Sequence, residues 1–147
     1  MENRIDLKQL EPEAYQALFG LEKYIVNAKI NPILSELIRI RASQINGCAY
    51  CIATHTKDAR KLDVSEQKLF ALPAWKESPL FSPEEKVVLS MTDEITLISH
   101  KGLSTKTYKL ALEMFDENTI AKIIMLIGTI NIWNRIAIAT KMVHPLK

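Results

Sequence analysis

The stretch of sequence that decides the fold is NPILSELIRIRASQINGCAYCIATH, residues 31–55. Asn31 is a preferred helix N-cap, and Pro32 suits the first helical position because its missing N–H would have no partner there. Gly47 is typical of a helix stop, since glycine adopts the left-handed conformation at low cost. We therefore expect one helix that begins at Pro32 and stops at Gly47, followed by a second that begins near Cys48.

The rest of the chain shows the same kind of helical punctuation. No alternation of strand type extends over a useful length, and the longest irregular stretch, LPAWKESPLFS at residues 72–82, is expected to be a loop anchored by Trp75 and Phe81. Helices are expected to start at Pro12, after Asp63 or Ser65, after Ser82 with a Ser82/Glu85 capping box, near Ser104 and after Asp116. The prediction for residues 1–147 is an all-α, single-domain helical bundle of about six to eight helices.

Composition and charge narrow the classes of function. The chain is 48% hydrophobic and 24% charged, which is ordinary for a globular protein, and its net charge is +2 with basic and acidic residues interleaved. Nucleic acid is therefore not an expected partner. The N-terminus lacks the apolar core of a signal peptide, so we expect a cytoplasmic protein in a reducing compartment.

The segment TIAKIIMLIGTINIWNRIAIAT, residues 119–140, is the most apolar of the chain. Its polar residues, among them Lys122 and Arg135, would be costly in lipid, so we interpret it as a buried helix and expect no membrane partner. Isoleucines and Trp133 surround nearly the whole helix, so more than one face must be covered. This pattern predicts a central core helix, a contact with a second subunit of a homo-oligomer, or both.

The two cysteines of the chain, Cys48 and Cys51, are three positions apart, and His55 follows four residues after the second. In the first turn of a helix both sulfurs would lie at the positive end of the helix dipole, which favours thiolate over thiol. Residues four apart on a helix can touch, so the imidazole can reach the sulfur of Cys51. The pattern indicates a redox-active dithiol with a base beside it.

Other interpretations of the cysteine pair are open. Cysteine is often simply buried as a small apolar residue. A metal site needs three or four ligands, and only His100, His144 and acidic groups could complete one here, so we predict no metal. Haem attachment is excluded, because it requires the histidine directly after the second cysteine.

Glu36 is a further candidate, because it lies in a partly apolar stripe of the preceding helix. If the two helices fold back around Gly47, Glu36 lies about 16 Å along one helix and His55 about 12 Å along the other, at 1.5 Å per residue. The carboxylate would then be level with the imidazole, and Glu36, His55 and Cys51 would form a proton path. The alternative is a surface ion pair of Glu36 with Arg39 or Lys57.

The sequence ELIRIRASQINGCAYCIATHTKDARK closely resembles the core motif of the alkylhydroperoxidase D-like, carboxymuconolactone decarboxylase superfamily. That motif is a glutamate, eleven residues, CxxC, three residues and a histidine, and Glu36, Cys48, Cys51 and His55 match it position for position. Similarity continues through FSPEEKVVLSMTDEITLIS and INIWNRIAIAT. Alkylhydroperoxidase D itself has a histidine between the cysteines, where this chain has Tyr50, and this leaves the proton relay one member short.

The resemblance implies an all-α fold that assembles as trimers or hexamers, and a peroxidase activity with neither metal nor organic cofactor. It implies that Cys51 attacks the peroxide, that Cys48 then closes the disulfide, and that Glu36 and His55 move protons. The expected partners are a small hydroperoxide and a dithiol reductant. Two alternatives stay open: decarboxylase-like chemistry with vestigial thiols, and a redox-sensing protein without efficient turnover.

Overall fold

The structure is a computed structural model that describes residues 4–146, and within these residues it consists of helices and connecting turns. This confirms the predicted all-α class, although the four-residue first helix was not predicted. The elements are α1 (Leu7–Leu10), α2 (Pro12–Asn27), α3 (Pro32–Asn46), α4 (Ala49–Lys61), α5 (Glu66–Ala71), the short 3-10 helix η1 (Leu72–Ala74), α6 (Pro83–Thr96), α7 (Thr105–Met114) and α8 (Glu117–Thr140).

The helices begin where the sequence places their caps. The side-chain oxygen of Asn31 accepts the N–H groups of Ile33 and Leu34 at 3.0 and 3.2 Å. Ser82 and Glu85 form the expected reciprocal capping box at the start of α6. Gly47 ends α3 with a φ of 71°, in the left-handed region where a side chain would be strained. The sharp reversal at Gly47 lays α4 back against α3.

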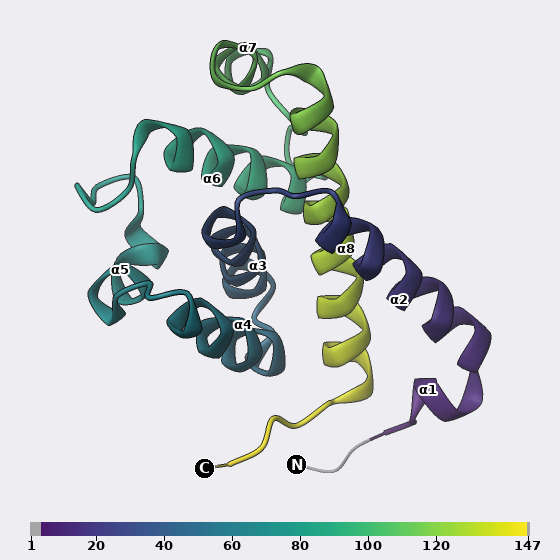
Figure 1. The fold of residues 1–147 in the computed structure, drawn as a ribbon. Helices are drawn as coiled ribbons and strands as arrows, with labels where there is room; N and C mark the ends of the chain where they lie inside the picture. Colours follow the sequence, from purple (N-terminus) through teal and green to yellow (C-terminus); the bar gives the residue numbers. More distant parts are fainter. Residues whose placement is uncertain (1–3, 147) are drawn as a thin grey trace.

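Helix α3 lies at the centre of the molecule, packed against α4, α6 and α8 (Figure 1). Leu37, Ile38 and Ile40 on α3 are fully buried. They contribute to two clusters of buried side chains, one shared mainly with α6 and α8 and the other with the segment around η1. In that segment Trp75 and Phe81 are both only 4% exposed, which confirms the predicted anchors of the loop.

Helix α8 runs the length of the molecule (Figure 1). By length and composition it could cross a membrane, and half of its most apolar stretch is buried inside the protein. Its polar residues contact neighbouring helices: Asn46 at the end of α3 donates hydrogen bonds to Asn131 and Asn134, each at 2.9 Å. Asn134 is fully buried and donates in turn to Ser43. These amides join α8 to α3.

Candidate active site

The cysteine pair lies at the N-terminus of α4, where the left-handed Gly47 places it. Cys48 is the N-cap residue, and its sulfur accepts a hydrogen bond from the backbone N–H of Cys51 at 3.3 Å. The two residues form a disulfide, with their Cα atoms 5.3 Å apart. Both are buried, at 1% exposure for Cys48 and 4% for Cys51. A thiolate at Cys48 would be stabilised by the N-terminus of α4.

Glu36 and His55 are in direct contact. One carboxylate oxygen of Glu36 lies 2.9 Å from Nδ1 of His55, and both side chains are 15% exposed. The fold-back geometry around Gly47 predicted this pairing from the helix rise alone. Since Glu36 occupies Nδ1, the other ring nitrogen of His55, Nε2, is the one available for proton exchange.

Arg39 lies beside this pair, one helical turn beyond Glu36. Its Nε is 4.0 Å from Glu36 Oε1, so the alternative partner considered from sequence is a neighbour of Glu36 at the limit of ion-pair distance. The guanidinium instead donates three hydrogen bonds of 3.1–3.2 Å to Glu22 on α2. Glu22 also accepts the indole N–H of Trp133 at 2.9 Å. Glu36, held by His55, is therefore backed by a second, fixed ion pair.

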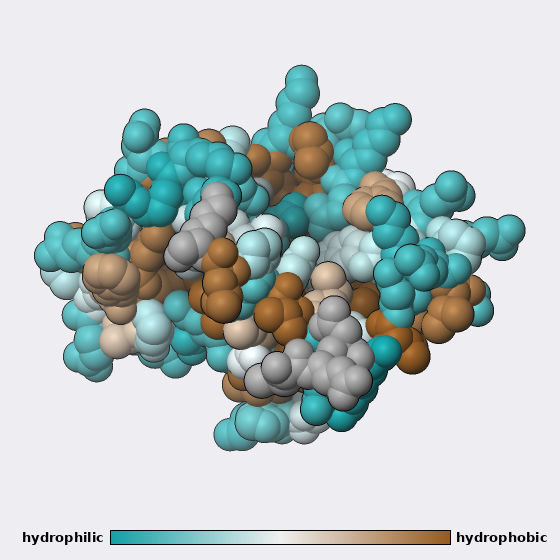
Figure 2. All heavy atoms as spheres, turned by 90° about the horizontal axis from the view of Figure 1, so that it is seen from below, coloured by the Kyte–Doolittle hydropathy of each residue, from teal (hydrophilic) through white to brown (hydrophobic). Residues whose placement is uncertain are grey.

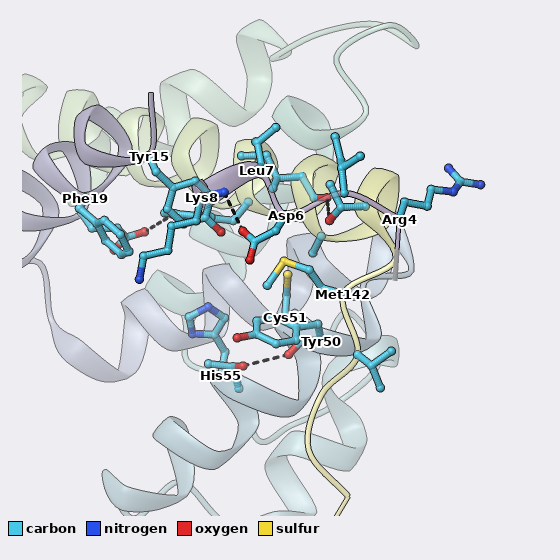
Figure 3. A pocket seen from close by; sticks show the side chains of 18 of the residues that line it. Arg4, Asp6, Leu7, Lys8, Tyr15, Phe19, Tyr50, Cys51, His55 and Met142 are labelled. Atoms are coloured by element: carbon cyan, nitrogen blue, oxygen red, sulfur yellow. Dashed lines mark hydrogen bonds between the residues drawn. The ribbon is translucent and has the colours of Figure 1, made fainter. Parts of the chain in front are cut away.

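A cavity of about 740 Å³ lies between α2, α4, α8 and residues 4–8. Cys51 and His55 line it, whereas Cys48 is not among the described residues of its wall. Figure 3 shows Tyr15 and Phe19 on one side of this space and Cys51, Tyr50 and His55 on the other. Seen from the end that carries both termini, the molecule is hollowed near its centre, with hydrophobic residues beside the hollow (Figure 2). A ligand in the cavity would meet the sulfur of Cys51.

Three aromatic rings form one wall of the cavity. Tyr15, Phe19 and Trp133 contact one another with ring centroids 5.4–5.8 Å apart, two of the three contacts being edge-to-face. Burial raises the pKa of Tyr15 above its ordinary value, and the nearby Tyr50 and Asp6 raise it further. The phenol of Tyr15 therefore stays neutral at physiological pH. We call these three residues the aromatic wall.

Sequence reasoning missed part of this site. It did not identify Glu22, Tyr15 or Phe19 of α2, because nothing in the spacing of α2 shows which of its faces borders the cavity. Tyr50, which lies between the two cysteines in the sequence, lines the cavity. The other two histidines do not line the cavity. His100 is exposed in the turns after α6, and His144 lies in the C-terminal segment.

One group of side chains has donor atoms close enough to suggest a metal site. The donor atoms of Glu36, His55 and Asp58 lie within 4.8 Å of one another. Two of these three are already hydrogen-bonded to each other, and Lys61 lies 2.7 Å from Asp58. The set offers a single nitrogen ligand and no thiolate.

Comparison with known proteins finds one matching family model and several similar proteins. The model of the carboxymuconolactone decarboxylase family matches residues 12–94. The uncharacterized protein YdfG of Bacillus subtilis (strain 168) is 42% identical over 139 residues, which is 95% of each chain. A solved structure from Agrobacterium tumefaciens, of a protein of unknown function suggested to be the antioxidant defence protein AhpD, is 35% identical. Its TM-score is 0.96 over 99% of this chain and 100% of that one.

A more distant structure shares the fold alone. The debrominase Bmp8 is 22% identical, with a TM-score of 0.82 over 93% of this chain and 74% of that one. The segment matched by the family model, residues 12–94, contains Glu36, both cysteines and His55. With this match and the 42% identity to YdfG over nearly the whole length, the chain belongs to the carboxymuconolactone decarboxylase family and has the alkylhydroperoxidase D-like fold.

Proposed function

We propose that this protein is a thiol peroxidase, which reduces small organic hydroperoxides by cycling Cys48 and Cys51 between dithiol and disulfide. One observation carries the proposal. Cys51 faces the cavity together with His55, and His55 is held at Nδ1 by Glu36. A nucleophilic sulfur, a base and a carboxylate that orients the base are the parts required for proton-coupled attack on a peroxide.

The first step forms a sulfenic acid. The thiolate of Cys51 attacks the terminal oxygen of the hydroperoxide, so that an S–O bond forms while the O–O bond breaks. The alkoxide leaves and takes from Nε2 of His55 the proton that the imidazole had accepted from the Cys51 thiol. The products are an alcohol and Cys51 sulfenic acid. Glu36 stabilises the imidazolium in between.

The second step closes the disulfide and releases water. The thiolate of Cys48 attacks the Cys51 sulfur, the S–S bond forms, and the hydroxide leaves with the proton of the Cys48 thiol. The sum of the two steps is one hydroperoxide and one dithiol converted to one alcohol, one water and one disulfide. The backbone N–H of Cys51, 3.3 Å from the Cys48 sulfur, supports the attacking thiolate.

A dithiol reductant then restores the enzyme. Because Cys51 lines the cavity and Cys48 does not, the reductant would attack the Cys51 sulfur. Cys48 leaves as the thiolate, and the N-terminus of α4 makes it a good leaving group, since a thiol of low pKa leaves faster. The two electrons come from the reductant, which is oxidised to its own disulfide.

The experiment that tests the proposal is steady-state consumption of tert-butyl hydroperoxide with dithiothreitol as reductant. Cys51→Ser should abolish turnover. Cys48→Ser should leave a sulfenic acid at Cys51 that a dimedone probe labels. Labelling of Cys48 in the Cys51→Ser variant, with Cys51 unreactive in the other, would reverse the roles of the two sulfurs. Oxidation of the wild type that stops after one equivalent would support the redox-sensor alternative.

A second candidate function is favoured by the aromatic wall. A dithiol can also reduce a halogenated ring, with an aryl bromide and the dithiol giving the unsubstituted ring, hydrogen bromide and the disulfide. The distant structural relative Bmp8 is a debrominase, and one of its solved structures contains 2,3,4-tribromopyrrole. Release of bromide from that compound in the presence of dithiothreitol would support this function. Turnover of hydroperoxide without bromide release would exclude it.

We also propose that the protein assembles as a homo-oligomer, a trimer or a hexamer. Four apolar side chains of α8 are between 38% and 45% exposed in the single chain, namely Ile124, Met125, Ile132 and Ile138. Their burial between subunits would contribute about 25 cal/mol per Å² of apolar area. Light scattering behind a sizing column tests the proposal, and a monomer at micromolar concentration would contradict it.

A further inference from the structure

We propose that the cavity selects hydroperoxides whose organic group is a neutral aromatic ring, bound between the aromatic wall and Cys51. The inference rests on the proposed function and adds the class of its substrate. It is carried by three observations: the size of the cavity, the arrangement of the three rings, and the neutralised charge behind them.

The size of the cavity exceeds what the peroxide group needs. Its volume of about 740 Å³ lies in the range of pockets that enclose whole organic ligands. Hydrogen peroxide or a short alkyl hydroperoxide would leave most of the aromatic wall in contact with water. A substrate with a ring can place the peroxide at Cys51 and still cover the wall on the opposite side.

Two rings of the wall, those of Trp133 and Tyr15, are held in place before any ligand binds. Trp133 donates its indole N–H to Glu22, and Glu22 is clamped by three hydrogen bonds from Arg39. Tyr15 packs edge-to-face against Trp133, with centroids 5.4 Å apart. Since little side-chain freedom remains to be lost on binding, the wall is preorganised for a flat partner. Aromatic pairs are favoured in edge-to-face and offset geometries, which a phenyl group can adopt here.

The aromatic wall itself presents rings to the cavity and carries no unpaired charge. Arg39 is buried on this wall, at 9% exposure, and its charge is neutralised by Glu22. Tyr15 stays a neutral phenol, because burial raises its pKa. Lys8 and Arg4 also line the cavity, on the side formed by residues 4–8. An organic group that lies against the three rings and the Arg39–Glu22 pair meets no unpaired charge there, so an anionic group would lose its hydration without gaining an ion pair from that contact. A neutral aryl group has no such cost.

The test compares cumene hydroperoxide with tert-butyl hydroperoxide, which differ only by phenyl in place of methyl. The ratio of their kcat/KM values, divided by the ratio of their rates with free dithiothreitol, isolates what the protein contributes. We expect this corrected ratio to be at least about tenfold in favour of cumene hydroperoxide, the size expected for a stacked, desolvated ring. A corrected ratio near one would overturn the inference, while turnover itself would leave the proposed function standing.

A matched pair of variants locates the preference. Phe19 on the aromatic wall is 50% exposed and Phe70 on α5 is 79% exposed, so neither substitution to leucine should unfold the protein. Phe19→Leu should lower the corrected ratio about threefold, the effect of losing one ring contact. Phe70→Leu should leave it unchanged. Equal ratios in wild type, Phe19→Leu and Phe70→Leu would show that the wall does not select the substrate.

A binding measurement keeps the inference testable if no hydroperoxide is turned over, an outcome that would reject the proposed function alone. The unreactive probes are 2-phenyl-2-propanol and tert-butanol at equal concentration. The aryl alcohol should shift the indole N–H resonance of Trp133 in nuclear magnetic resonance spectra and leave that of Trp75, which lies outside the cavity wall, in place. Equal shifts with both alcohols, or none with the aryl alcohol, would overturn the inference.

Discussion

On each of two faces of helix α3, an arginine pairs with a carboxylate that also accepts the indole N–H of a tryptophan. Only one of these two faces borders the cavity. On the first face, Arg39 forms a bidentate ion pair with Glu22, which also accepts the indole N–H of Trp133. The polar atoms lie 2.9–3.2 Å apart throughout. The cavity beside this face contains the sulfur of Cys51.

On the second face, Arg41 pairs with Asp93 of α6 through two hydrogen bonds of 2.6 and 3.1 Å. Asp93 also accepts the indole N–H of Trp75 at 3.3 Å. Here the tryptophan is 4% exposed and packs in the cluster around η1. The same chemical unit therefore fastens two helices together at this face.

The two units differ in whether the Nε atom of the arginine has a hydrogen-bond partner. Arg41 donates through Nε to Asp93, whereas Nε of Arg39 is buried without a hydrogen-bond partner and lies 4.0 Å from Glu36. The guanidinium of Arg39 thus contributes its positive charge to the Glu36–His55 pair while its hydrogen bonds go elsewhere. In the proposed mechanism the unit at Arg39 therefore acts on the Glu36–His55 pair beside the cavity. The unit at Arg41 joins α3 to α6 and to the segment around η1.

The largest expected effect is a slower oxidation of Cys51, expected only for a substitution on the face that borders the cavity. Glu36→Gln should slow oxidation of Cys51 by about a hundredfold, because a carboxylate that stabilises the imidazolium is lost and general acid–base groups contribute on this order. Stopped-flow oxidation of the reduced protein by hydroperoxide is the readout. The control is Asp93→Asn on the other face. A wild-type rate for Glu36→Gln would remove Glu36 from the mechanism.

The second expected effect is a loss in the free energy of unfolding when the ion pair on the other face is broken. Asp93→Ala leaves the partly buried guanidinium of Arg41, 17% exposed, without its partner and the indole of Trp75 without its acceptor. Breaking such a pair from one side costs about 3 kcal/mol, which urea denaturation would measure. Asp58→Ala, which breaks an exposed pair with Lys61, should cost less than about 1 kcal/mol. Equal losses in the two variants would show that burial does not distinguish these ion pairs.

The sequence predicted the parts of the fold and site that depend on one or two adjacent helices. Asn31, Gly47 and the capping box at Ser82 fix helix ends through local chemistry, so they could be read directly. The contact of Glu36 with His55 followed because both helices are rigid rods that leave the same turn. These inferences need only the geometry of α3 and α4.

The parts that the sequence did not predict depend on how distant helices pack. Glu22 lies 17 positions before Arg39, and Trp133 lies 111 positions after Glu22. Nothing in the periodicity of α2 shows that its Tyr15 would meet Trp133 on α8, because both residues simply fit the apolar pattern of their helices. The catalytic roles of the cysteines also remain predictions, since contacts place side chains without measuring reactivity.

A smaller effect should come from the same conservative substitution at both arginines. Arg39→Lys and Arg41→Lys keep the charge and remove the bidentate fork. At Arg41 we expect a loss of about 1 kcal/mol in the free energy of unfolding and an unchanged rate. At Arg39 we expect a rate of Cys51 oxidation about threefold lower, because the charge beside Glu36 moves. Identical phenotypes for the two variants would show that both units are purely structural.

The smallest expected effect lies on the α6 side and depends on pH. Glu94 follows Asp93 and accepts hydrogen bonds from the backbone N–H and hydroxyl of Ser104 and from the hydroxyl of Thr107, at 2.8–3.0 Å. Burial raises the pKa of Glu94, but these three hydrogen bonds to the ionised form outweigh it, so the pKa is lowered from 4.5. The stabilisation is therefore fully present above pH 4.5 and is lost as the pH falls through the lower, folded-state value.

Glu94→Gln removes that titration, so its stability deficit should be largest at neutral pH and should shrink as the pH falls from about 5 toward 3. The deficit should stay below about 1 kcal/mol, because Glu94 is only partly buried and the solvent that reaches its carboxylate screens the interaction. Urea denaturation at a series of pH values measures it, with Glu113→Gln, an exposed glutamate of α7, as the matched control. Stability curves of Glu94→Gln and wild type that run parallel down to pH 3 would show that the cap at Ser104 does not depend on the charge. Whichever result is found, the rate of Cys51 oxidation at neutral pH should match wild type, since Glu94 is not among the residues that line the cavity, whereas Glu36 contacts His55, which does line it.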